Sequence, residues 1–216
     1  MAWRASGNLS RRPYFLSCGL PLNCLNEEVG GMARQGWSMS EMEIRRIAYL
    51  LSETDLVVAA IAERMDCSKS AMNVEYRLAR VSQAPAAVED CLCALRWVMR
   101  NAKQYGFDTA KLVVSGGSAG GHLALTTGMI PASEGLDRQC PGTEQLRVAA
   151  IVDWYGITDV ADLLDGENMR TFAVEWLGSR PNRFEIAKRV SPLAYVRPGI
   201  PPIISIQGDA DPVVPY

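Results

Sequence analysis

From residue 81 onward, short apolar runs alternate along the chain with amphipathic stretches. This alternation is typical of an α/β sheet whose strands are mainly parallel. Residues 85–105 predict the first helix, because apolar side chains recur there at the spacing of one helical face and Gly106 follows as a stop signal. That face consists of Val88, Cys91, Leu92, Leu95, Val98, Met99 and Ala102.

The uniformly apolar run at 112–114 predicts a short strand that is buried on both faces. Residues 148–152 and 203–206 predict a second and a third buried strand. We expect a helix of small residues over 122–128, directly after the first of these strands. The segment between the second and third strands, 157–195, carries turn residues and aromatic side chains in a mixed helical pattern. We interpret this segment as a cap-like insertion over the strand ends.

Residues 37–80 carry a different pattern, that of successive short helices. Ser40 and Glu43 form a capping box before an amphipathic stripe, and a second stripe over 58–65 is followed by Ser68, which can cap a third helix. The arrangement resembles a helix-turn-helix. We therefore expect residues 1–72 to form an atypical N-terminal segment that is helical from about residue 40.

Charge argues against DNA binding by this segment. Residues 37–80 contain six Lys or Arg against seven Asp or Glu, a net charge of −1, whereas a module that contacts phosphates should be basic. The whole chain has 22 Lys or Arg against 24 Asp or Glu. We expect no nucleic-acid partner, and a plain helical hairpin remains the alternative to a DNA-binding module.

Composition narrows the class of protein further. A chain of 216 residues that is 48% apolar and 21% charged is typical of one soluble globular domain or a small pair, and it excludes disordered, collagen-like and coiled-coil proteins. No apolar run is long enough to cross a membrane as a helix. The apolar run at 14–16 is also too short for a signal peptide. We therefore expect no membrane partner and a cytoplasmic location.

Cysteine and histidine usage limits the possible chemistry. The six cysteines lack the paired spacing of a zinc site and the density of a disulfide scaffold, so we interpret them as buried free thiols in a reducing compartment. His122 is the single histidine, which excludes a His-rich metal site, and we expect neither a metal nor another cofactor. The cysteines are Cys18, Cys24, Cys67, Cys91, Cys93 and Cys140.

The candidate chemistry lies between the first predicted strand and its helix. Gly116 to Gly120 carry the pattern G-x-S-x-G, in the strand–turn–helix setting that makes it a nucleophile elbow. Ser118 would occupy a strained, sharp turn, where only Gly116 and Gly120 leave enough room and Gly117 completes the elbow. The turn would expose the Ser118 hydroxyl at the sheet edge, and the N–H of Ala119 could stabilise a developing oxyanion.

A second interpretation of these glycines is a turn that binds phosphate or merely packs closely. A nucleotide-binding loop would carry a Lys after the glycines, or an acidic ribose ligand downstream of a G-x-G-x-x-G pattern. Neither is present in that form. The nucleophile elbow is the preferred interpretation.

Residues 73–216 resemble the α/β-hydrolase superfamily, and within it bacterial esterases related to hormone-sensitive lipase, acetyl xylan esterase and feruloyl esterase. The resemblance runs through four segments in order, 73–79, 85–90, 116–125 and 208–215. It implies a three-layer α/β-hydrolase sheet that hydrolyses short acyl, acetyl or feruloyl esters through an acyl-serine intermediate. Carried over by position, it implies Ser118 as the nucleophile, Ala119 as the oxyanion donor and Asp211 as the triad acid.

Asp211 also fits this role by its place in the chain. It follows a buried strand and would lie at the same sheet edge as Ser118, where a carboxylate could orient an imidazole. The order Ser then Asp is that of the superfamily. The alternative is an Asp that forms or caps a turn beside Asp209 and Pro212.

The chain also departs from the family pattern. The family places its triad His after a further strand, but no His follows Asp211, and His122 lies one helical turn after Ser118, where we expect a structural histidine. The Gly-rich oxyanion loop of the relatives has only a weak counterpart at 30–31. Moreover, residues 73–79 should be a strand in the hydrolase interpretation and part of a third helix in the helix-turn-helix interpretation.

These departures suggest that residues 73–216 form a partial α/β-hydrolase domain, incomplete at both ends, behind an unrelated or misread segment 1–72. Because the triad His is absent, we expect impaired turnover. Two alternatives stay open: a DNA-binding or regulatory protein with an inert hydrolase-like body, and a serine peptidase of the prolyl-oligopeptidase type.

Overall fold

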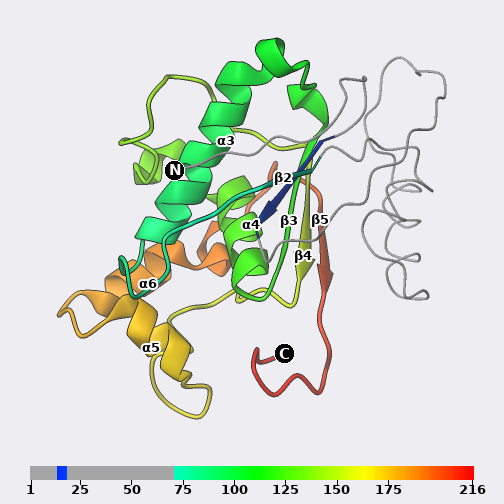
Figure 1. Ribbon diagram of the computed structural model, residues 1–216. Coiled ribbons are helices and arrows are strands. Elements are labelled where there is room, and N and C mark those ends of the chain that lie inside the picture. Colours follow the sequence, from blue (N-terminus) through cyan, green and yellow to red (C-terminus); the bar gives the residue numbers. More distant parts are fainter. Residues whose placement is uncertain (1–13, 19–70) are drawn as a thin grey trace.

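The computed structural model describes residues 14–18 and 71–216, which form a parallel sheet with helices packed along one side (Figure 1). The sheet has five strands in the order β2-β1-β3-β4-β5, and every neighbouring pair is parallel. The strands are β1 (Tyr14–Cys18), β2 (Ala71–Asn73), β3 (Leu112–Gly117), β4 (Ala150–Trp154) and β5 (Ile203–Ile206). This confirms the three predicted strands. The predicted burial of 203–206 is wrong, however, because β5 lies at the edge of the sheet and none of its residues is fully buried.

Within residues 71–216, four α-helices and three short 3-10 helices connect the strands. They are α3 (Ala86–Tyr105), η1 (Thr109–Lys111), α4 (Ala119–Met129), η2 (Ala132–Glu134), α5 (Thr171–Leu177), α6 (Arg183–Val190) and η3 (Pro192–Tyr195). In Figure 1, the four α-helices lie on the same side of the sheet, with α5 near the end at which the strands finish. No helix within residues 71–216 combines the length and apolar content that a membrane crossing requires.

Helix α3 forms where the apolar stripe predicts it. The side chains of Val88, Cys91, Leu95 and Val98 on that stripe are fully buried. The helix ends at Gly106, whose left-handed φ of 70° is a conformation that glycine adopts without steric cost. The hydrophobic periodicity of the sequence therefore predicted the position of α3 and the face that it buries.

The central strands bury side chains on both faces, as their uniform apolar character predicts. Leu112, Val114 and Ile151 pack into the main core, which they share with α3 and α4. Val113 and Val152 alternate with them and belong to a second cluster, on the opposite face of the sheet. The middle of the sheet therefore carries buried apolar side chains on both of its faces.

The N-terminal segment contributes to this sheet. Strand β1, which lies within 1–72, is inserted between β2 and β3, with Phe15 opposite both Ala71 and Val113. Residues 71–73 form β2 and residues 74–78 are not helical, so the third helix of the helix-turn-helix interpretation does not continue through 71–79. The other predicted helices of that interpretation lie outside the described residues.

Segment 157–195 contains α5, α6 and η3, in line with its mixed helical pattern. Two hydrogen bonds connect it to Ala84, just before α3. The Ala84 N–H donates to the Trp176 carbonyl (2.9 Å), and Arg180 Nη2 donates to the Ala84 carbonyl (2.6 Å). The segment also reaches the chain after β5, since Arg170 Nε donates to the Val213 carbonyl (2.9 Å). The segment therefore links the helix layer to the part of the chain that carries Asp211.

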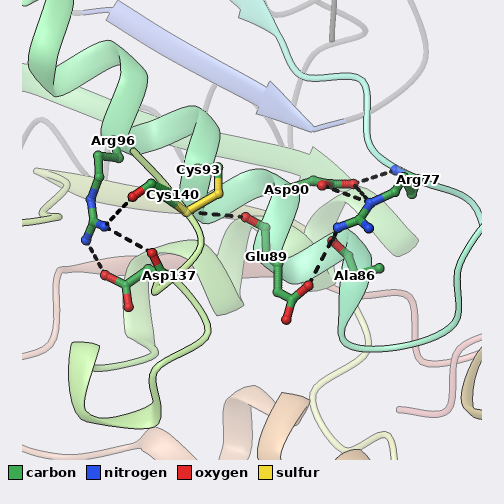
Figure 2. Close-up of a disulfide and its surroundings, with 8 residues drawn as sticks. All are labelled: Arg77, Ala86, Glu89, Asp90, Cys93, Arg96, Asp137 and Cys140. Carbon is green, nitrogen blue, oxygen red and sulfur yellow. Dashed lines mark hydrogen bonds and ion pairs between the residues drawn. A yellow bond between two sulfur atoms is a disulfide. The ribbon is translucent and has the colours of Figure 1, made fainter. Parts of the chain in front are cut away.

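The prediction that Cys93 and Cys140 are free thiols is wrong, because they form a disulfide (Figure 2). Cys91 is buried, as expected. The bond ties α3 to the loop before β4, and next to it the buried Arg96 pairs with Asp137 and donates to the Cys140 carbonyl (3.4 Å). The sequence could not reveal this pairing, because it depends on a loop 47 residues away returning to α3.

We predict that replacing both Cys93 and Cys140 by alanine lowers the free energy of unfolding by about 2–4 kcal/mol, because the crosslink restricts the unfolded chain. The measurement is chemical denaturation of the oxidised protein and of the variant. Leu92→Ala, which truncates a buried side chain of the same helix, serves as the control for lost packing. The prediction fails if addition of a reductant destabilises the double variant as much as it destabilises the unsubstituted protein.

Candidate active site

Ser118 lies at the sharp turn between β3 and α4, as the G-x-S-x-G pattern predicts. Its backbone has φ 54° and ψ −120°, a conformation that costs a non-glycine residue about 1–3 kcal/mol. The turn is held because the Ser118 N–H donates to the Trp154 carbonyl (2.9 Å) and the Ser118 carbonyl accepts from the His122 N–H (3.0 Å). A hydrogen bond to β4 and the first turn of α4 thus hold Ser118 in this strained conformation.

Helix α4 begins at Ala119, three residues earlier than the predicted 122–128. As the first helical residue, Ala119 has an N–H without a partner inside the helix, and it lies at the positive end of the helix dipole. Gly116 and Gly120 are buried on either side of the turn, and Gly117 is half-buried. The elbow residues therefore lie together at the carboxyl end of β3, with one backbone donor beside Ser118.

The early helix start depends on a close approach between α4 and β4. A Cβ at Gly121 would lie 2.5 Å from Asp153 Oδ1 and 2.9 Å from the Gly156 Cα. Any side chain at 121 would push the helix away from the strand and would move the Ser118 turn with it. No sequence pattern predicted this role of Gly121, although the residue follows the elbow directly.

Asp153 is a buried carboxylate beneath this contact, at the end of β4. Oδ1 accepts from the Gly156 N–H (2.9 Å) and Oδ2 accepts from the Ser205 hydroxyl of β5. Burial raises the pKa of Asp153, while these two hydrogen bonds counteract part of the increase. Asp153 therefore ties the ends of β4 and β5 together below the elbow, a structural role that its position after an apolar run did not reveal.

Tyr155, next along the chain, has φ 44° and lies beside the elbow. Its hydroxyl is 3.0 Å from the position that a Cβ on Gly117 would take, and its backbone N–H donates to the Ile206 carbonyl (2.7 Å). The side chain is 44% exposed. Tyr155 could not be recognised from the sequence, because no sequence pattern indicates a positive φ at a tyrosine.

Asp211 lies in the segment that follows β5. Because β3, β4 and β5 are parallel, this segment leaves the sheet at the same edge as the elbow (Figure 1). Asp211 Oδ1 accepts from the N–H groups of Val213 (2.8 Å) and Val214 (3.1 Å), and these bonds hold the pKa of Asp211 below its usual value. Oδ2 has one long contact, to Gln207 Nε2 (3.4 Å). One oxygen thus forms the turn that the alternative interpretation expects, and the other is available to orient an imidazole.

The turn around Asp211 is fixed from two sides. Gln207 Nε2 donates to the Val214 carbonyl (3.1 Å), and the buried Val214 side chain anchors the turn. From segment 157–195, the Arg170 side chain donates to the Val213 carbonyl, and its positive charge also contributes to lowering the pKa of Asp211. The carboxylate is therefore held ionised at neutral pH.

His122 has the surroundings of a structural histidine. Its side chain is buried, Nδ1 lies 2.9 Å from the Ile157 carbonyl, and the ring packs edge-on against Trp176 with 5.3 Å between ring centroids. Burial lowers its pKa to about 4, so the ring is neutral and its Nδ1–H donates to Ile157. The ring is held between α4 and α5 and makes no described contact with Ser118.

Two other expectations concern groups around the site. Within residues 71–216, no group of three or more His, Cys, Asp or Glu side chains could hold a metal ion. The weak counterpart of the oxyanion loop, at 30–31, lies outside the described residues. Ala119 is therefore the one predicted oxyanion donor whose position is described.

Comparisons with known proteins place this elbow among esterases. The BD-FAE family model matches residues 51–216. Esterase LipQ from Mycobacterium tuberculosis is 33% identical over 139 residues, which cover 61% of this chain and 32% of LipQ. Esterase LipC from the same organism is 28% identical over 148 residues, which cover 67% of this chain and 37% of LipC. The chain spans about a third of the length of these curated relatives.

Solved structures give the same picture of the fold. A thermophilic esterase of Thermogutta terrifontis, Est2, matches with a TM-score of 0.58 and 28% identity, covering 95% of this chain and 63% of Est2. A truncated carbohydrate esterase from gut microbiota matches with a TM-score of 0.63 and 22% identity, covering 97% of this chain and 70% of that protein. Together with the parallel sheet and its elbow, these matches confirm the predicted α/β-hydrolase fold, of which the chain holds an incomplete part.

We predict that Gly121→Ala destabilises the protein by about 1–3 kcal/mol, because the added Cβ overpacks the contact with Asp153 and Gly156. The measurement is the free energy of unfolding in denaturant. Gly208→Ala is the matched control, since a Cβ at Gly208 meets no atom within 4 Å. Equal effects of the two substitutions would contradict the close approach of α4 to β4.

We also predict that His122 makes stability depend on pH. The unfolded chain binds a proton at His122 near pH 6.5, whereas the folded protein binds it only near pH 4, so acidification between these values favours unfolding. The loss reaches up to about 3 kcal/mol at the acid end. Unfolding free energies are measured at pH 7 and pH 4.5 for the protein and for His122→Leu. The prediction is wrong if the variant loses as much stability between the two pH values as the protein does.

Proposed function

The chain belongs to the BD-FAE family, and on that premise we propose that it hydrolyses carboxylic esters through an acyl-serine intermediate on Ser118. The observation that carries the proposal is the strained backbone of Ser118 at the junction of β3 and α4. Strain of this kind persists where surrounding structure holds it, and it clusters at active sites. Here it presents a hydroxyl at the sheet edge, directly before the N-terminus of a helix.

The elbow supplies two parts of this reaction. The Ser118 Oγ attacks the ester carbonyl carbon, forming a C–O bond while its proton passes to a general base. The carbonyl oxygen becomes an oxyanion, which the Ala119 N–H stabilises together with the field of α4. Collapse of this intermediate breaks the bond to the alcohol, which leaves with the proton, and water then releases the acid from Ser118.

Asp211 is proposed as the triad acid. Its low pKa keeps it ionised, and its Oδ2 is free of strong hydrogen bonds, which is what orienting an imidazolium requires. His122 does not serve as the base, because its Nδ1 is engaged by Ile157 and its low pKa disfavours proton uptake. The 216 residues contain no second histidine, so we propose that this chain turns over esters slowly.

The proposed substrates are small esters of the short acyl, acetyl or feruloyl type. Support comes from the names of relatives, which include an arylesterase of Saccharolobus solfataricus and the carbohydrate esterase from gut microbiota. A peptidase of the prolyl-oligopeptidase type shares the elbow but has no support among these relatives. The DNA-binding alternative likewise has none, and residues 71–73 form a strand of the sheet instead of a helix.

We also propose a location for the protein, on the basis of its cysteines. Disulfides form and persist in oxidising compartments and are rare in the cytosol. The bond between Cys93 and Cys140 therefore favours an oxidising compartment over the cytoplasmic location expected from the sequence.

We predict that a fluorophosphonate probe labels Ser118 slowly and that steady-state hydrolysis of p-nitrophenyl acetate is lower, by about four to six powers of ten, than that of a complete triad enzyme. Added imidazole should raise the rate, because it can act as the missing base. Labelling is measured by intact-mass and peptide mass spectrometry, and hydrolysis by release of p-nitrophenol.

Two variants separate the outcomes of this experiment. Ser118→Ala should abolish labelling and the imidazole-dependent increase, whereas Ser179→Ala, which changes an exposed serine after α5, should leave both unchanged. Labelling that persists in Ser118→Ala would overturn the hydrolase proposal. Rapid Ser118-dependent turnover without imidazole would instead overturn the proposed impairment.

A further inference from the structure

Two residues other than glycine have a positive φ in the described part of the chain, Ser118 and Tyr155. They follow neighbouring strands at one sheet edge, since Gly117 of β3 is paired with Trp154 of β4. The strain at Ser118 is explained by the elbow. Tyr155 has no such explanation, and its strain needs one, because a bulky residue rarely adopts a φ of 44°.

The backbone around Tyr155 is fixed without help from its side chain. Its own N–H donates to the Ile206 carbonyl (2.7 Å), and the next residue, Gly156, donates its N–H to Asp153 Oδ1 (2.9 Å). The preceding carbonyl, that of Trp154, accepts from the Ser118 N–H. A glycine at 155 would keep all these bonds and would adopt the same φ without strain.

Core packing does not account for the tyrosine either. Its side chain is 44% exposed, whereas the neighbouring Asp153 is buried and Trp154 packs against the second core cluster. Its ring lies over Gly117, because a Cβ there would be 3.0 Å from the hydroxyl oxygen and 3.3 Å from Cζ. A half-exposed aromatic ring is thus held beside the serine at the cost of backbone strain.

We propose that Tyr155 is a substrate-contacting residue of the ester site, whose ring selects esters with a planar aromatic group next to the carbonyl. The proposal rests on the proposed function for its location, beside the nucleophile. Stacked or edge-on contacts between aromatic rings contribute beyond simple burial, and they favour an aromatic ligand over a saturated one about three- to tenfold. Because Gly117 has no side chain, the ring can lie flat against the elbow.

The test compares the binding of two esters of similar size, methyl benzoate and methyl cyclohexanecarboxylate. Dissociation constants are measured by ligand-observed NMR in the Ser118→Ala background, so that no ester is consumed. We expect about three- to tenfold preference for the benzoate in that background. Tyr155→Phe should keep the preference, because the ring remains, and Tyr155→Leu should abolish it.

Two further variants exclude a merely structural role. Tyr155→Gly should lose the preference and yet unfold at a higher denaturant concentration, since it relieves the strained φ. Tyr105→Leu changes a tyrosine that packs on Trp97 and Phe107 at the far end of α3, and it should leave the preference unchanged. A preference that survives Tyr155→Leu, no preference in the starting protein, or a Tyr155→Gly variant of lower stability would each overturn the proposal.

These outcomes are independent of the hydrolase proposal. Binding is measured without turnover, so failure of the fluorophosphonate probe to label Ser118 would count against hydrolysis and not against the role of Tyr155. Conversely, labelling of Ser118 together with equal binding of the two esters would retain the hydrolase proposal and remove the aromatic contact.

Discussion

The close contact between the start of α4 and the end of β4 is the constraint on which the rest of the site depends. Gly121 allows the helix backbone to approach Asp153 and Gly156 so closely that a Cβ at this position would lie 2.5 Å from Asp153 Oδ1 and 2.9 Å from the Gly156 Cα. From that approach follows the hydrogen bond between the Ser118 N–H and the Trp154 carbonyl, which holds the serine in its strained conformation. The elbow therefore depends on packing, because Ser118 keeps its conformation only while α4 and β4 remain in contact.

Further contacts fix the strand ends around the serine. Asp153 bonds to both Gly156 and Ser205, and so joins the ends of β4 and β5 below the elbow. Helix α3, held by its apolar stripe and by the disulfide between Cys93 and Cys140, covers the sheet next to α4. Strain at Ser118 and at Tyr155 can persist because these neighbours leave the backbone no alternative path.

The charge states of His122 and Asp211 have separate physical causes. His122 is neutral because it is buried between α4 and Trp176, far from water that could stabilise its charge. Asp211 is ionised because two backbone N–H groups and the Arg170 charge favour the carboxylate. The chain thus holds a carboxylate prepared to orient an imidazole and a histidine that is unsuited to receive it, which is why the elbow is the stronger indication of function.

Much of this architecture could be predicted from the sequence, because it depends on local patterns. The stripe of α3 with Gly106, the apolar runs of β3, β4 and β5, and the glycines around Ser118 all express constraints between residues close in the chain. The remaining features depend on residues that meet only after folding. The insertion of β1 between β2 and β3, the disulfide across 47 residues and the buried Asp153 result from long-range packing.

The sequence by itself determined the sharp turn at Ser118 and the helix start beside it, since a strand–turn–helix with glycines at fixed spacing leaves little freedom. It also predicted Ser118 as the nucleophile, Ala119 as the oxyanion donor and Asp211 as the triad acid. Only the tertiary structure decided that His122 is buried, that Gly121 sets the approach of α4 to β4, and that Tyr155 lies over Gly117. The physical reason is that burial, close approach and backbone strain belong to pairs of elements. The sequence of one element alone does not determine its burial, its close approach to another element or its backbone strain.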